Sequence, residues 1–224
     1  MKKIGLVVFA ATLLIGLIFA GGCSYSNVKN GGVKGSGTLK SERRDVSGFS
    51  KIDVGGAVNI EVTAQKDFNV AVEADDNLLE FIKTEVSGDT LKIYSEGGIS
   101  HEQNISVKIS MPEIKDLDIS GASNAVVSNV KTDSLKLNVG GASKIKIDGE
   151  AKVLESEASG ASKIDAEGLK VENAEVEASG ASSVTVSPAN ELKADASGAS
   201  DIYYTGEPKN IVQNSSGASS IKKK

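Results

Sequence analysis

The phrase Ser-Gly-Ala-Ser, or a close variant of it, recurs six times in the second half of this chain. Its central glycines are Gly121, Gly141, Gly160, Gly180, Gly198 and Gly217, so the phrase returns every 18 to 20 residues. An earlier relative, Gly55-Gly56-Ala57-Val58, has the same pattern. A fixed period of this length is typical of a solenoid, in which each repeat forms one coil and buries its apolar face only by stacking on its neighbours.

The residues around each repeat alternate between apolar and polar, which predicts strands rather than helices. Two columns, two positions before and four positions after the central glycine, are expected to face inward: Ile119, Val139, Ala158, Ala178, Ala196 and Ser215, and Ala125, Ile145, Ile164, Val184, Ile202 and Ile221. The polar column three positions before the glycine is expected to face outward: Asp118, Asn138, Glu157, Glu177, Asp195 and Asn214. The predicted fold is therefore all-β: a parallel β-solenoid, or β-helix, of stacked coils of about 19–20 residues.

The first half of the folded part repeats less regularly. Strand-like runs are expected at residues 51–54, 58–63, 69–73, 90–94 and 105–110, where apolar and polar residues alternate. Residues 77–83 are expected to form a short helical insertion. The preceding Asp75, Asp76 and Asn77 are interpreted as a turn or a helix N-cap rather than a calcium loop, because the spaced ligands of such a loop do not follow them.

The N-terminus predicts export. Lys2 and Lys3 precede an uncharged apolar run over residues 4–20, as in a signal peptide, and Ala20-Gly21-Gly22-Cys23 resembles a lipoprotein cleavage site. We therefore expect a signal peptide at 1–22, lipidation of Cys23, a Gly-rich flexible linker at 23–37 and a folded domain at 38–224. The alternatives are an ordinary secretory signal or an uncleaved anchor. Cys23 is the sole cysteine, so no intramolecular disulfide is available.

These features together resemble one known family. The signal sequence, the opening phrase Phe49-Ser-Lys-Ile-Asp-Val-Gly-Gly-Ala-Val-Asn-Ile-Glu-Val and the repeated Ser-Gly-Ala-Ser units are similar to the bacterial family called putative auto-transporter adhesin, head GIN domain. The resemblance runs from about Phe49 to the C-terminus. It implies a β-solenoid on an exported, often lipid-anchored protein, and it brings no catalytic motif with it.

The sequence offers little for catalysis or metal binding. His101 is the only histidine, so with Cys23 acylated no histidine and thiol set for zinc or copper exists, and every serine nucleophile would depend on the same base. A β-helix lyase needs a base that is frequently arginine, and the only arginines are Arg43 and Arg44, upstream of the coils. We expect no cofactor, no metal site and no catalytic residue.

Three residues are the candidates for ligand contact: Tyr203, Glu157 and Glu177. Glu157 and Glu177 are expected to stack one strand spacing apart, near the separation of the two carboxylates of a retaining glycosidase. The alternatives are a solvated column or a strip that binds cations such as calcium. By its position in the repeat, Tyr203 faces outward and is available to stack on a sugar or a protein, whereas Tyr204 faces inward.

The leading prediction is a cell-envelope lipoprotein, held to the cell membrane or outer membrane by lipid on Cys23 and facing out of the cytoplasm. It acts as a non-catalytic binding or adhesion module for a glycan or an envelope protein. A net charge of −5 and the absence of a basic aromatic patch argue against nucleic acid. The alternatives are a polysaccharide-active β-helix enzyme and a structural, self-associating or signalling-accessory envelope protein. The oligomeric state stays open.

Overall fold

The computed structural model describes residues 32–100 and 104–224. The expected signal peptide, the expected lipidation site Cys23 and His101 lie outside these ranges. The described residues form β-strands joined by turns, without a helix. Accordingly, none of them belongs to a helix that is long and apolar enough to span a bilayer.

Most strands belong to one 15-stranded sheet that folds back on itself, and we name its two layers face A and face B. Face A contains the strand segments that lead into the Gly-Ala turns, and face B contains those that follow the turns. From the N-terminal end of the stack, the strands confined to face A are β6 (Ile82–Ser87), β7 (Thr90–Ser95), β3 (Lys51–Val54), β10 (Asp116–Ile119) and β16 (Asn210–Ser215). Those confined to face B are β2 (Leu39–Arg44), β5 (Asn69–Asp75), β9 (Ile105–Ser110), β4 (Val58–Thr63), β15 (Asp201–Tyr204) and β17 (Ser220–Lys223).

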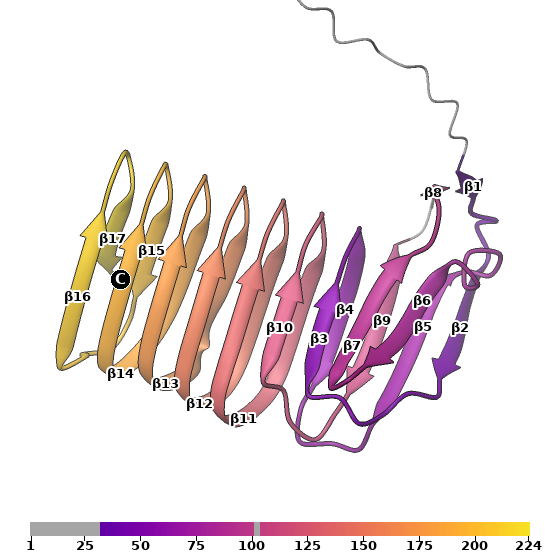
Figure 1. The fold of residues 1–224 in the computed structure, drawn as a ribbon, viewed down its shortest axis with the longest axis horizontal. Helices are drawn as coiled ribbons and strands as arrows, with labels where there is room; N and C mark the ends of the chain where they lie inside the picture. Colours follow the sequence, from indigo (N-terminus) through magenta and orange to yellow (C-terminus); the bar gives the residue numbers. More distant parts are fainter. Residues whose placement is uncertain (1–31, 101–103) are drawn as a thin grey trace, which may run out of the picture. The chain divides into compact units, whose positions relative to one another are not determined.

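Four longer strands run along face B, bend, and continue along face A of the next coil. They are β11 (Asn124–Val139), β12 (Lys144–Ala158), β13 (Lys163–Ala178) and β14 (Ser183–Ala196). Each pairs in parallel with the next over most of its length, and the register shifts only around the bend. Within this part of the chain the coils lie in one row, with the Gly-Ala turns along one edge and the bends along the other (Figure 1). The predicted parallel β-solenoid is confirmed.

Antiparallel strands lie at the N-terminal end of both faces. On face A, β6 pairs antiparallel with β7, and on face B, β5 pairs antiparallel with both β9 and β2. The first parallel coil is therefore flanked by antiparallel strands at the N-terminal end of the stack. In the repeat region, by contrast, all neighbouring strands are parallel.

The Gly-Ala turns hold neighbouring coils together through backbone and serine hydrogen bonds. The N–H of Ala161 donates to the carbonyl of Gly141, and that of Ala181 donates to the carbonyl of Gly160. The last serine of the first five phrases is buried: Ser123, Ser143, Ser162, Ser182 and Ser200. The Ser200 hydroxyl donates to the carbonyl of Ala178 in the preceding coil, at 2.9 Å. These serines satisfy polar groups inside the stack that water does not reach.

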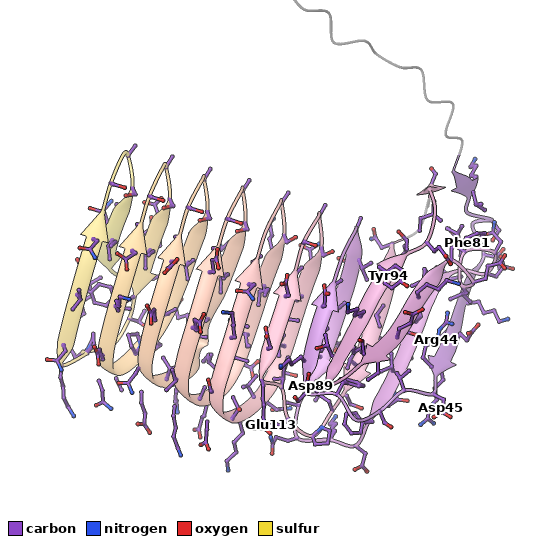
Figure 2. The ribbon with its side chains drawn as sticks, in the orientation of Figure 1. Arg44, Asp45, Phe81, Asp89, Tyr94 and Glu113 are labelled. Carbon is purple, nitrogen blue, oxygen red and sulfur yellow. The ribbon has the colours of Figure 1, made fainter. Side chains whose placement is uncertain are left out.

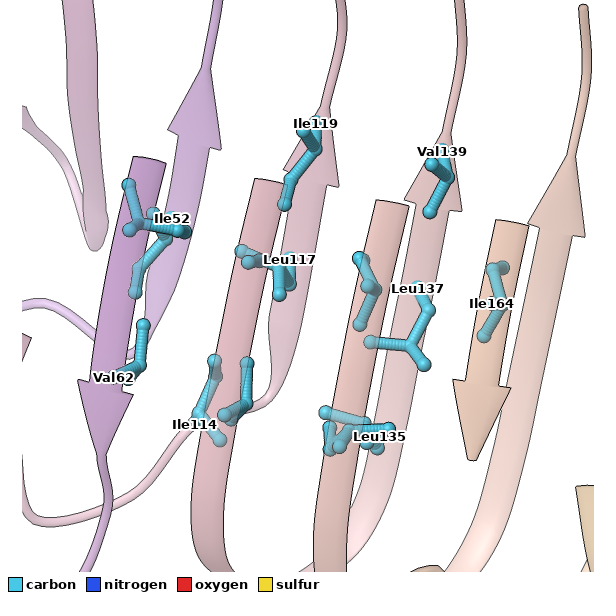
Figure 3. Close-up of a cluster of buried hydrophobic side chains, with 14 of the residues drawn as sticks. Ile52, Val62, Ile114, Leu117, Ile119, Leu135, Leu137, Val139 and Ile164 are labelled. Carbon is cyan, nitrogen blue, oxygen red and sulfur yellow. The ribbon is translucent and has the colours of Figure 1, made fainter. Parts of the chain in front are cut away.

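The core fills the space between the two faces. Figure 3 shows Leu117 and Leu137 in successive coils of face A, with Ile119 and Val139 beside them, and all four side chains are buried. The two columns expected to face inward are buried from Ile119 to Ala196 and from Ala125 to Ile202. Ser215 and Ile221 are the exceptions, because their coil is stacked on one side only.

The helix expected at residues 77–83 was a wrong prediction. The stretch forms turns, and β6 begins at Ile82. Leu78 and Leu79 are buried, and this stretch carries the chain from the end of β5 on face B to the start of β6 on face A. The N–H of Leu78 donates to the carbonyl of Asp75 and that of Phe81 donates to the carbonyl of Leu78, as in turns. Tertiary packing therefore overrides the helical propensity of the run.

Part of the expected linker belongs to the folded unit. β1 (Val33–Lys34) pairs in parallel with β8 (Ile99–Ser100). The run Asp75–Asn77, interpreted above as a turn or N-cap, holds this segment in place. The N–H of Gly37 donates to Asp75 Oδ1 at 2.9 Å, and Asn77 Nδ2 donates to the carbonyl of Lys34 at 2.8 Å. These residues thus have a structural role.

Candidate functional site

A column of acidic and amide side chains runs along the outside of face A. Strand alternation directs these side chains outward, and the parallel register places each beside its equivalent in the next coil. We name as the acidic column the residues Asp53, Asp118, Asn138, Glu157, Glu177, Asp195 and Asn214. Glu157 and Glu177 are thus neighbours in β12 and β13, as the sequence predicted.

The column two residues earlier on the same face contains two ion pairs between its own members. Lys136 forms an ion pair with Glu155, and Lys193 forms one with Glu175. Within the described part of the chain, no ion pair reaches the acidic column, and Asn214 Nδ2 donates to Asp195 Oδ1 at 2.7 Å. The acidic column therefore presents carboxylate oxygens that are free to accept hydrogen bonds from a ligand.

Two shallow grooves lie along the acidic column, beside the serines of the turns. The first, of about 380 Å³, is lined by residues that include Asp118, Asn138, Glu157 and Ser159. The second, of about 270 Å³, begins at Glu157 and continues past Glu177 to Asn214. Because Glu157 lines both grooves, they form one trough across successive coils.

Asp118, near one end of the acidic column, lies close to other carboxylates. Partial burial raises the pKa of Asp118 above its usual range. The nearby carboxylates of Asp53, Asp116 and Glu157 raise it further. The column thus carries an unfavourable interaction in the free protein, and a ligand that donates hydrogen bonds or positive charge relieves it.

The geometry of Glu157 and Glu177 does not resemble that of a glycosidase pair. Both project from one face, in neighbouring coils of the same column, so a ligand in the trough meets them from one side. Glycoside hydrolysis requires two carboxyl groups that flank the scissile bond. Among the described residues, no cluster of three or more His, Cys, Asp or Glu side chains is suited to a metal ion.

The structure separates the third candidate residue from the other two. Tyr203 lies in β15 on face B, half-buried between Thr185 and Lys222 of the adjacent strands. Tyr204 faces the core and is 9% exposed, as its position in the repeat predicted. Glu157 and Glu177 therefore share a trough on face A, and Tyr203 belongs to a different surface.

A separate groove, on the bends between the faces, was not predicted from the sequence. It is lined by charged residues of three successive coils, among them Lys131, Glu150 and Lys170. The signal was present as three charged triplets at residues 131–133, 150–152 and 170–172, which recur with the period of the repeat.

The fold is shared with several crystal structures. One described as a putative adhesin from Bacteroides fragilis aligns with a TM-score of 0.72 and 22% identity, over 86% of this chain and 100% of that one. A putative adhesin from Parabacteroides merdae aligns with a TM-score of 0.54 and 20% identity, over 86% and 98% of the two chains. A putative lipid binding protein from Parabacteroides distasonis aligns with a TM-score of 0.51 and 21% identity, over 85% and 98%. At these identities the likeness establishes the fold.

Two comparisons concern the sequence itself. The model of the family described as putative auto-transporter adhesin, head GIN domain, matches residues 48–208. No curated protein matches the sequence.

Proposed function

Because the chain belongs to the family described as putative auto-transporter adhesin, head GIN domain, we propose that it is a non-catalytic binding module of the cell surface. The observation that carries this proposal is the acidic column, which lies along a trough and whose carboxylates form no ion pair with any residue that the structure describes. The two similar structures described as putative adhesins support a binding role.

A repeating ligand is the partner that this surface fits best. The rungs of the acidic column are separated by about 4.8 Å, the spacing of paired strands. Each rung offers an oxygen acceptor to hydroxyl or amino groups, so a polymer makes the same weak contact several times. Linked contacts of this kind raise the overall affinity well above that of a single one. A glycan or the polar surface of an envelope protein has the required groups.

The proposal includes export and attachment to the membrane. A signal peptide at 1–22 and lipid on Cys23 would hold the folded domain outside the cytoplasm, with its faces turned to the surroundings. Since Val33–Lys34 is paired with β8, we place the proposed linker before this strand. A tether at one end leaves both faces of the coils accessible.

The test compares two double variants of face A. Glu157→Gln with Glu177→Gln removes two charges from the acidic column, and Glu155→Gln with Glu175→Gln removes two charges from the paired column beside it. Both are assayed on immobilised glycans and on cell-envelope fractions, and the soluble products are analysed for cleavage.

We expect the first variant to bind about tenfold more weakly, which corresponds to about 1.4 kcal/mol, and the second to bind nearly as well as the wild type. Equal losses in both variants would show that the acidic column has no special role. Glycan fragments released by the wild-type protein would replace the binding module with a polysaccharide-active enzyme.

A further inference from the structure

The groove on the bends has a regular construction, and we name it the corner groove. It has a volume of about 530 Å³, within the range of ligand sites. Figure 2 shows Glu113, at one end of this groove, on the edge of the stack opposite the Gly-Ala turns. The residues that line it are Glu113, Lys131, Thr132, Asp133, Glu150, Ala151, Lys152, Lys170, Val171, Glu172 and Ala189.

Three successive coils contribute one rung each to the corner groove. In every rung a small central residue forms the floor, and an exposed charged residue stands on either side of it. The rungs are Lys131-Thr132-Asp133, Glu150-Ala151-Lys152 and Lys170-Val171-Glu172. The parallel register aligns the first residues of the rungs as one wall and sets their central residues in a row.

The charges alternate in two directions at once. Along the first wall the order is Lys131, Glu150, Lys170, and along the second wall it is acid, base, acid. Each rung therefore carries one positive and one negative group, and their sides exchange from one rung to the next. If the pattern of charges is moved along the groove by one rung and its two walls are exchanged, the same pattern results. This is the symmetry of a two-fold screw axis along the groove.

Most of the charged side chains in the walls of the corner groove are not engaged in ion pairs with other described residues. Asp133 and Lys152 form an ion pair at 2.7 Å. Lys131, Glu150 and Lys170 form none among the described residues, and Glu172 likewise has no ion pair there. Exposed pairs contribute only about 0–1 kcal/mol, so a ligand that satisfies the lysines displaces the Asp133–Lys152 pair at small cost.

Polysaccharides joined by β-1,4 linkages have the same symmetry. Successive sugars in such a ribbon are turned by half a revolution, so a substituent on each sugar points to alternate edges of the chain. The ribbon advances by nearly one strand spacing, about 4.8 Å, with each sugar. A sugar placed over one rung thus puts the next sugar, with its edges reversed, over the following rung.

We propose that the corner groove binds a β-1,4-linked polyuronate, a glycan with one carboxylate on each sugar. Its carboxylates meet Lys131, Lys152 and Lys170 in turn, on alternate walls, and the hydroxyls of the opposite edges donate to the acidic residues. The lysines have the longest side chains of the walls and donate charge-assisted hydrogen bonds, which are stronger than those between neutral groups. The floor of small residues leaves room for the sugar rings.

This inference rests on the proposed function and names a ligand class for it, at a site separate from the acidic column. The net charge of the chain is −5, so binding of a polyanion depends on the local lysines and weakens as salt screens them.

The experiment measures binding of fluorescent oligosaccharides to the full chain in detergent. The probes are β-1,4-linked glucuronate, α-1,4-linked galacturonate of equal length and charge, β-1,4-linked glucosamine and the neutral β-1,4-glucan. Lys131→Gln, Lys152→Gln and Lys170→Gln are combined in one variant. The matched control combines Lys144→Gln, Lys146→Gln and Lys163→Gln, three exposed lysines of face B that form no ion pair in the described structure.

We expect the wild type to bind β-1,4-glucuronate at least tenfold more tightly than the other probes, the groove variant to lose this preference and the control to keep it. Equal affinity for the α- and β-linked polyuronates, or equal losses in both variants, would reduce the effect to general charge attraction and overturn the assignment. Preference for glucosamine would overturn the assignment of a carboxylate ligand. Binding of envelope fractions without binding of glucuronate would overturn this inference alone, whereas cleavage of the probes would contradict the proposed function itself.

Discussion

Gly160 lies directly over Gly141 in the stack, so closely that a Cβ on Gly160 would stand 2.6 Å from the Gly141 carbonyl oxygen. The same oxygen accepts the hydrogen bond of the Ala161 N–H at 2.8 Å. Gly160 also has a φ of +75°. Glycine is therefore required here for two reasons, the left-handed conformation and the close approach of two coils.

Gly160→Ala is expected to lower the free energy of unfolding by about 2–4 kcal/mol, from the cost of positive φ and of overpacking. Ala161→Ser, at the exposed neighbouring position, is the control and should change it little. Urea unfolding followed by circular dichroism measures both. A change below about 0.5 kcal/mol for Gly160→Ala, as at an ordinary surface site, would contradict the contact between the coils.

Ser200→Ala is expected to destabilise the fold by about 1–2 kcal/mol, because a buried hydroxyl loses its hydrogen bond. The Ser200 hydroxyl contacts the carbonyls of Ala178 at 2.9 Å and Ser197 at 2.8 Å. Ser197→Ala, at an exposed position of the same turn, is the matched control. If thermal unfolding showed equal effects for the two variants, the buried serine ladder would have no special part in holding the coils together.

Asp118→Asn is expected to stabilise the protein near pH 7 by about 0.2–1 kcal/mol, the cost of opposed like charges in a sheet. The pKa of Asp118 is raised in the folded state, so the folded protein binds this proton more tightly. The free energy of unfolding therefore falls as pH rises from the unfolded value of about 3.9 through the higher folded value. Thermal unfolding should show that Asp118→Asn is more stable than the wild type near neutral pH and that this difference disappears in acid.

Asp133→Asn is the control, because the pKa of Asp133 is shifted in the opposite direction to that of Asp118. Hydrogen bonding to Lys152, together with its charge, lowers the pKa of Asp133. A lowered pKa contributes stability above the unfolded value, and this stability is lost as pH falls through the folded value. Asp133→Asn should therefore be neutral or destabilising near pH 7. Identical responses of the two variants would contradict the role of the neighbouring acids at Asp118.

Tyr204→Ala is expected to destabilise the fold by about 2–4 kcal/mol, the cost of a cavity where an aromatic side chain is lost from the core. Tyr203→Ala, on the outer side of the same strand, should cost less than about 1 kcal/mol. Urea unfolding separates the two. If Tyr203→Ala then reduced binding to glycans while it left stability unchanged, face B would also contact ligand.

Cys23 is expected to carry lipid in the protein isolated from membranes. Mass spectrometry should show the mass of a diacylglycerol on Cys23 and no residue before it, and Cys23→Ala should appear in the soluble fraction. An unmodified Cys23 at the membrane would replace the lipoprotein prediction with an uncleaved anchor. Neither result bears on the fold, because this residue precedes the described part of the chain.

The repeat made the solenoid predictable because the same residue types return at the same place in every coil. The spacing of Gly141, Gly160 and Gly180 indicated the length of a coil, and the alternation around them indicated which side chains face inward. Glu157 and Glu177 could be placed side by side on the outer face for the same reason. In a stack of equivalent coils, residues at the same position of the repeat become neighbours. The inward columns and the neighbouring positions of Glu157 and Glu177 could therefore be predicted from the local sequence.

The N-terminal part of the fold was less predictable, since its contacts are not periodic. Asp75 and Asn77 hold residues 34–37 through hydrogen bonds between segments about forty positions apart, and no local pattern indicates such a partner. Leu78 and Leu79 suggested a helix, yet residues 76–81 form the turns that connect β5 on face B with β6 on face A.

The coil, its inward columns and the acidic column could be predicted from the sequence, because each depends on the order of residues within one repeat. Which exposed groups share a surface became visible only in the folded arrangement of the coils. It separated Tyr203 from Glu157, and it brought Lys131, Lys152 and Lys170 to one groove on alternate walls. The physical reason is that the bends shift the register between coils, and the position of a wall depends on that register rather than on any single repeat.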